Sequence, residues 1–176
     1  MSAARADQAQ VSAKVGFGEG AGSVSTGLGQ LDYLVGELGR GARLQLSLEV
    51  APGAVDPAVA GAGRKVGEAL APLLRAGGAA GTGFAWAPAD EALAGSVIEV
   101  SERPMLVANA DFSGVGGLGK NVVRVFLDEL AAGAGLNVHI RVLEGRDPQN
   151  VLRAIFKALG ASIGQACRTP EGGVPS

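Results

Sequence analysis

The stretch ELGRGARLQLSLEV, residues 37–50, decides the fold, because a related stretch, ELAAGAGLNVHIRV, returns at residues 129–142. The two align without a gap at an offset of 92 positions, and VGEAL at 66–70 aligns with LGASI at 159–163 at nearly the same offset. In the longer pair, the end of a helical pattern leads into an alternating strand. The chain is therefore predicted to contain a duplicated unit of strands and helices.

Each predicted unit has strands on one side and two helices on the other, so it needs a partner for its helical face. Packing the two units helix to helix satisfies that need. We therefore expect an α/β (α+β) fold of duplicated β-β-(β)-α-β-α units, with two sheets of the four-stranded type flanking a central layer of helices. The first half is assigned to residues 8–77, the second to 78–168 and a flexible C-terminal tail to 169–176.

Hydrophobic periodicity places the elements within these halves. Strands are expected at residues 11–18, 42–50, 83–87, 95–102, 104–112 and 136–144. Helices are expected at residues 28–39, 56–75, 121–133 and 147–167. The last helix has the clearest start, because Asp147 can cap its free amides and Pro148 suits the first helical position.

Composition excludes several classes of function. The net charge is −2 with no basic block, which argues against nucleic-acid binding. Residues 76–94 are too broken by Gly, Pro and charge to span a bilayer, and the N-terminal MSAARADQAQ lacks the apolar region of a signal peptide. The single cysteine, Cys167, is expected to be packed and reduced. We expect a cytoplasmic protein with no nucleic-acid or membrane partner.

Six short segments in order along the chain carry a resemblance to a known family. They are TGLGQLDYL (26–34), APADEALA (87–94), SERPML (101–106), GLNVHIRVLEGR (135–146), LRAIFKAL (152–159) and GGVPS (172–176). With the duplication, they make the chain resemble imidazoleglycerol-phosphate dehydratase, a hydro-lyase of histidine biosynthesis. The resemblance implies a duplicated fold of the ribosomal protein S5 domain 2-like type, assembled into cubic shells around bound manganese with active sites between subunits.

The manganese ligands that the resemblance implies are missing from this sequence. The family carries a His-His-x-x-Glu motif at the start of the second helix of each half and one more His in each first helix. These positions fall on Tyr33, Asp56, Pro57, Ala60, Val125, Gln149, Asn150 and Arg153. Neutral amides bind manganese weakly, and Arg153 places a positive charge where the family has a carboxylate. We therefore expect no cofactor and no metal-dependent catalysis.

Other polar residues allow alternatives at this site. A hard-cation site could be rebuilt from the carboxylates of Asp32, Glu37 and Asp56. The only histidine, His139, is expected to be an ordinary strand residue whose imidazole is hydrogen-bonded to a neighbour. The pair Asp90 and Glu91 keeps the Asp-Glu pair of the family and is expected to cap or bridge rather than to move protons.

Part of a phosphate pocket is kept. The resemblance assigns substrate-phosphate contacts to Arg103, Lys157 and Ser176, whose guanidinium, ammonium and hydroxyl groups suit a phosphate dianion. The alternative is that Arg103 and Lys157 form ordinary surface ion pairs.

A glycine-rich segment offers a second kind of site. GVGGLGKN, residues 114–121, matches both G-x-G-x-x-G and G-x-x-x-x-G-K between a predicted strand and helix. Asn121 stands where a phosphate-binding loop needs Ser or Thr, and too little chain follows for a doubly wound sheet. Nucleotide binding through Gly114–Lys120 is kept as an alternative.

These features together predict a non-catalytic relative of the dehydratases. It would act as an assembly or scaffold subunit, or would bind a phosphorylated small molecule, and an active dehydratase paralogue is a candidate partner. The alternative is a dehydratase that works without metal or with sites completed by a partner chain. We expect a homo-oligomer, either a trimer or a shell of two dozen subunits, with the trimer favoured because bridging metals are absent.

Overall fold

The computed structural model describes residues 10–18, 22–112 and 117–176. The strands are β1 (Val11–Phe17), β2 (Val24–Ser25), β3 (Leu44–Val50), β4 (Thr82–Ala89), β5 (Ala92–Val100), β6 (Met105–Ala108) and β7 (Leu136–Glu144). The helices are α1 (Gly29–Ala42), α2 (Val55–Leu74), α3 (Val122–Ala134) and α4 (Pro148–Cys167). No helix in this described part of the chain is long and apolar enough to cross a membrane.

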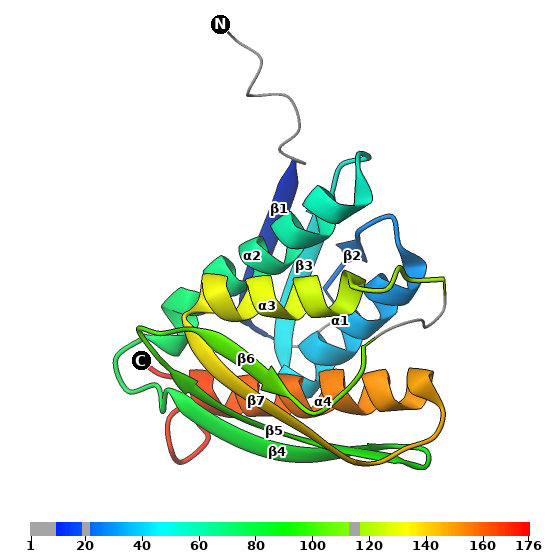
Figure 1. Cartoon of the computed structure of the whole chain (residues 1–176). Helices are drawn as coiled ribbons and strands as arrows, with labels where there is room; N and C mark the ends of the chain where they lie inside the picture. The colour runs from blue at the N-terminus through cyan, green and yellow to red at the C-terminus, as the bar shows by residue number, and fades with distance from the viewer. Residues whose placement is uncertain (1–9, 19–21, 113–116) are drawn as a thin grey trace, which may run out of the picture.

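Two sheets enclose the helices, as the sequence predicts (Figure 1). Their strand orders are β1-β3-β2 and β4-β5-β7-β6. Helices α1 and α2 lie against the first sheet, α3 and α4 lie against the second, and α1 packs on α4 as α2 packs on α3. The described part of the first sheet has three strands rather than the expected four, because it contains no counterpart of β4.

The two halves also correspond in detail. Arg43 follows the end of α1 and Gly135 follows the end of α3. Both capping residues lie in the left-handed region, with φ of 53° and 67°, and they are 92 positions apart. Each helix then leads into a central strand that pairs in parallel with a short neighbour, β2 for β3 and β6 for β7. This agreement is consistent with an internal duplication.

The core fills the space between the sheets. Phe126 of α3 and Phe156 of α4 are fully buried, and their rings stack with centroids 6.2 Å apart. Cys167 is buried, as predicted, and the burial raises the pKa of its thiol to about 11. The start of α4 is also as predicted, because Asp147 Oδ1 accepts a hydrogen bond from the backbone N–H of Gln149 at 2.9 Å, with Pro148 as the first residue.

Candidate functional site

A carboxylate from the β4–β5 hairpin caps the start of α4. Glu91 Oε1 accepts hydrogen bonds from the backbone N–H groups of Arg146 (3.1 Å) and Asp147 (2.8 Å). Its other oxygen accepts from Asn150 Nδ2 at 2.8 Å. The side chain of Asn150, at a position where the resemblance implies a metal ligand, is thus engaged by Glu91.

These hydrogen bonds hold Glu91 in its charged form. The backbone N–H of Asp147, followed by the side chain of Asn150, lowers the pKa of Glu91 from 4.5 to about 2. A carboxyl group that releases its proton so readily is a poor proton donor or acceptor near neutral pH. Glu91 therefore anchors the hairpin to the helix start, which agrees with the capping role expected from the sequence.

The low pKa of Glu91 predicts a specific pH dependence of stability. In the unfolded chain Glu91 takes up a proton near pH 4.5, whereas in the folded chain it stays charged down to about pH 2. Its contribution is therefore complete above pH 4.5 and disappears as the pH falls to about 2. Thermal melts of Glu91→Gln should lie below those of the wild type at pH 7 and converge with them toward pH 2.

A matched control for this prediction is Glu102→Gln. Glu102 is exposed and has no hydrogen bond or ion pair to another described residue. Its variant should follow the wild-type melting curve at every pH. Parallel pH profiles for Glu91→Gln and the wild type would show that the hydrogen bonds to Glu91 do not contribute to stability.

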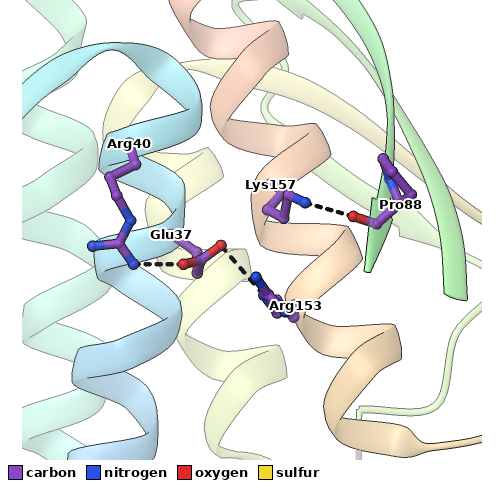
Figure 2. Close-up of polar contacts among 5 residues, drawn as sticks. All are labelled: Glu37, Arg40, Pro88, Arg153 and Lys157. Atoms are coloured by element: carbon purple, nitrogen blue, oxygen red, sulfur yellow. Dashed lines mark hydrogen bonds and ion pairs between the residues drawn. The ribbon is translucent and has the colours of Figure 1, made fainter. Parts of the chain in front are cut away.

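The second feature of the site is an ion pair between α1 and α4 (Figure 2). Glu37 is buried, and its Oε1 accepts a hydrogen bond from Arg40 Nη2 at 2.5 Å. Its Oε2 lies 3.6 Å from Nε of Arg153, which is within ion-pair distance but too long for a hydrogen bond. This Nε atom is buried and has no hydrogen-bond partner. The guanidinium of Arg153 thus supplies positive charge at a position for which the resemblance implies a metal-binding carboxylate.

Within a single chain, the described residues do not gather a set of ligands for a manganese ion. Among the described residues no three His, Cys, Asp or Glu side chains are grouped closely enough to hold a metal. The rebuilt site of Asp32, Glu37 and Asp56 is therefore not formed within this part of the chain. Asp32 instead accepts hydrogen bonds from the backbone N–H (2.8 Å) and the hydroxyl of Thr26, and Glu37 faces two arginines.

The predicted phosphate residues are not brought together within one chain. Lys157 Nζ donates to the carbonyl oxygen of Pro88 at 2.6 Å, so its ammonium group ties α4 to β4 (Figure 2). Pro88 pairs with Leu93 at one end of β5, whereas exposed Arg103 follows the other end. The strand between these ends spans about 23 Å. Ser176 is exposed at the end of the chain.

The two remaining candidates are His139 and the glycine-rich loop, and the structure describes the loop only in part. His139 is exposed on the outer face of the second sheet, and its side chain has no hydrogen bond to another described residue, so no partner of the expected kind lies within this part of the chain. Of the Gly114–Lys120 loop, residues 114–116 lie outside the described residues. The sheet next to it is mostly antiparallel, which is not the setting of a dinucleotide site.

The chain is similar to known proteins in both sequence and structure. The family model described as imidazoleglycerol-phosphate dehydratase matches residues 26–163. The imidazoleglycerol-phosphate dehydratase of Clostridium botulinum (strain Kyoto / Type A2) is 32% identical over 161 residues, covering 88% of this chain and 82% of the relative. That of Methanothermobacter thermautotrophicus is 33% identical over 166 residues, covering 90% of this chain and 84% of the relative.

Solved structures show the same fold. The crystal structure of imidazoleglycerol-phosphate dehydratase from Staphylococcus aureus matches with a TM-score of 0.83 and 26% identity, over 91% of this chain and 94% of that one. The Pyrococcus furiosus structure matches with a TM-score of 0.80 and 19% identity, over 92% and 90% of the two chains. The molecule is therefore an α/β protein with the fold of these dehydratases. The chain belongs to the imidazoleglycerol-phosphate dehydratase family.

Proposed function

We propose that this chain is a non-catalytic member of its family that acts as an assembly or scaffold subunit. The observation that carries the proposal is the position of Arg153. At position 153 the resemblance implies a carboxylate that binds a metal. This chain instead has a guanidinium there, and it lies against Glu37. A fixed positive charge repels a divalent cation, so the change does more than remove one ligand.

The chemistry of the reaction supports this proposal. The family removes water from a substrate that carries an imidazole, and the resemblance assigns the stabilisation of charge on that ring to manganese as a Lewis acid. This chain offers amides at Gln149 and Asn150, and the amide of Asn150 is bonded to Glu91. Glu91 is held ionised by its donors and is poorly suited to replace the metal as an acid.

Binding of a phosphorylated small molecule is the less favoured alternative. Lys157 already donates to Pro88, and about 23 Å of strand separates that end of β5 from the end followed by Arg103. A phosphate could meet both groups only between two subunits. We therefore place assembly ahead of phosphate binding.

Metal content and turnover test the proposal directly. The purified full chain is loaded with manganese, desalted and assayed for bound metal and for dehydration of imidazoleglycerol phosphate. We expect far less than one ion per chain and no turnover above buffer. The Clostridium botulinum relative, prepared in the same way, is the positive control for both assays.

Two results would overturn the proposal. One bound manganese ion per chain would mean that the ligand set is completed between subunits. Turnover above buffer would mean that the chain is a dehydratase by another route. A third arm tests the partner-chain alternative: the chain is mixed with the active relative, and activity per active subunit should stay unchanged if the chain contributes no catalytic group.

A further inference from the structure

One edge of the first sheet, the edge formed by β1, is open within the described part of the chain (Figure 1). On its other side β1 pairs with β3, and the carbonyl oxygen of Gln10 accepts a hydrogen bond from the backbone N–H of Ala51 at 2.9 Å. Backbone groups alternate in direction along an antiparallel strand, so every second residue of β1 directs its N–H and C=O groups away from β3. No described strand pairs with these residues, which are Val11, Ala13, Val15 and Phe17.

The second half of the chain shows which element fills the equivalent place. Ser47 of β3 and His139 of β7 are 92 positions apart. Their partners are Lys14 in β1 and Val97 in β5, so β1 corresponds to β5. Strand β5 pairs with β7 on one side and with the whole of β4 on the other. The place that β4 fills in the second half is therefore open beside β1.

The open edge leaves the inner face of β1 partly exposed. In β5, Ala94, Ser96 and Ile98 face the helices and are buried. The corresponding residues of β1 also contact the core but are only partly buried, and these are Val11, Ala13 and Val15. A strand laid along β1 would cover this face, and it would find unpaired N–H and C=O groups in the arrangement that strand addition uses.

The free edge of β4 is protected, whereas the edge of β1 is not. Of the β4 residues directed away from β5, Phe84 donates its N–H to Oε1 of Gln165 at 3.0 Å, and Pro88 has no N–H. Proline and covering groups are two means by which edge strands avoid further pairing. Strand β1 contains no proline, and its outward N–H groups have no side-chain acceptor among the described residues.

We propose that β1 binds an extended segment of a partner protein, which adds to the first sheet as an antiparallel strand. Strand β4 indicates the size of side chain that such a segment can carry. Its inward-facing residues are all small, and they are Gly83, Ala85, Ala87 and Ala89. A Cβ atom at Gly83 would lie 1.9 Å from the carbonyl oxygen of Ser162 in α4. Because α2 corresponds to α4, we expect glycine or alanine at alternate positions of the bound segment.

The charge of the segment follows from Lys14. This residue is exposed on the outer face of β1, and its side chain has no ion pair with another described residue. Its counterpart Val97 pairs with Phe84 of β4. An acidic residue of the segment at the place of Phe84 would lie directly across from Lys14 and form a cross-strand ion pair. The inference goes beyond the proposed function, because it assigns a binding partner that involves neither manganese nor turnover.

A synthetic peptide tests the proposal with the full chain. The sequence Thr-Gly-Glu-Ala-Thr-Ala-Thr-Ala keeps the inward residues of β4 and places glutamate where β4 has Phe84. The fluorescence anisotropy of the labelled peptide should show saturable binding. Ala13→Pro should weaken binding by about tenfold or more, because it removes an outward N–H and obstructs the added strand. The variant should still fold, since the pairing with β3 does not use that N–H.

The matched control is Ala13→Ser, which keeps the N–H and should bind the peptide as the wild type does. A charge exchange gives a second measurement that does not depend on proline. Lys14→Glu should weaken binding by about threefold, and a peptide with lysine in place of its glutamate should recover the loss.

Several results would overturn the proposal. They are no saturable binding by the wild type, equal binding by Ala13→Pro and Ala13→Ser, and no recovery in the charge exchange. Binding that appears only after removal of residues 1–9 would assign the edge to the start of the same chain. Self-association that Ala13→Pro abolishes, without peptide binding, would assign it to a second copy. These readouts are independent of metal content and turnover, which test the proposed function.

Discussion

Replacing Gly160 by alanine should lower the free energy of unfolding by about 3 kcal/mol, although alanine is the better helix former. Gly160 lies where α4 crosses α1, and a Cβ atom there would sit 2.3 Å from the carbonyl oxygen of Leu38. That oxygen belongs to the backbone of another helix, so the two helices must move apart to make room. The movement would also loosen the packing around the crossing, where side chains interlock at crystal-like density.

The equivalent position in the first half should behave alike. Gly67 of α2 faces α3, and a Cβ atom added there would lie 2.3 Å from the carbonyl oxygen of Leu130. Gly36→Ala is the matched control, because that glycine is also inside a helix but its Cβ would meet only the flexible side chain of Arg40 at 3.5 Å. Gly36→Ala should be neutral or stabilising by up to about 1 kcal/mol. Urea unfolding at fixed protein concentration measures all three, and a Gly160→Ala variant as stable as Gly36→Ala would contradict the close crossing.

The layers of the fold could be predicted because the sequence repeats. The duplicated segment fixes the order helix, strand, helix in each half, and the offset of 92 positions also relates Leu38 to Leu130. Glycine recurs at the two contact points for a steric reason that pattern alone does not reveal. The sequence therefore predicts the layers correctly, while the closeness of the helices becomes evident only in three dimensions.

The candidate site was less predictable. The sequence identifies which ligand positions carry unsuitable groups, because that needs only residue types and order. It does not reveal that Arg153 faces Glu37 or that Lys157 meets Pro88, since each pair joins residues distant in the sequence. The sequence also does not place His139 on the exposed face of its strand, because alternation along a strand does not say which face a neighbouring subunit or solvent covers.

The pair of Glu37 and Arg153 connects the residue type at position 153 to the stability of the fold. Glu37 comes from α1 and Arg153 from α4, so the pair bridges the same crossing that Gly160 keeps close. A buried carboxylate needs compensating positive charge, and here two arginines supply it from within the chain. A carboxylate at position 153 would need a cation from solution instead.

Reversing this charge with Arg153→Glu should therefore destabilise the protein by about 2 kcal/mol. A carboxylate at position 153 would face Glu37, whose side chain is only 11% exposed, and two like charges at that depth repel strongly. We expect a smaller loss of stability than for a fully buried pair, because the Arg153 side chain is 36% exposed and its charge is partly screened by water. Arg153→Gln, which removes the charge without reversing it, should cost about 1 kcal/mol.

The electrostatic origin of this effect can be separated from lost packing by a double-mutant cycle. Adding Glu37→Gln to Arg153→Glu removes the repulsion and should return about 1 kcal/mol of the stability lost. Urea unfolding at several salt concentrations is measured for the wild type, Glu37→Gln, Arg153→Glu and the double variant. Added salt should reduce the difference in the free energy of unfolding between Arg153→Glu and the wild type, because it screens the partly exposed charge. If the double variant were as unstable as Arg153→Glu alone, packing rather than charge would account for the role of Arg153.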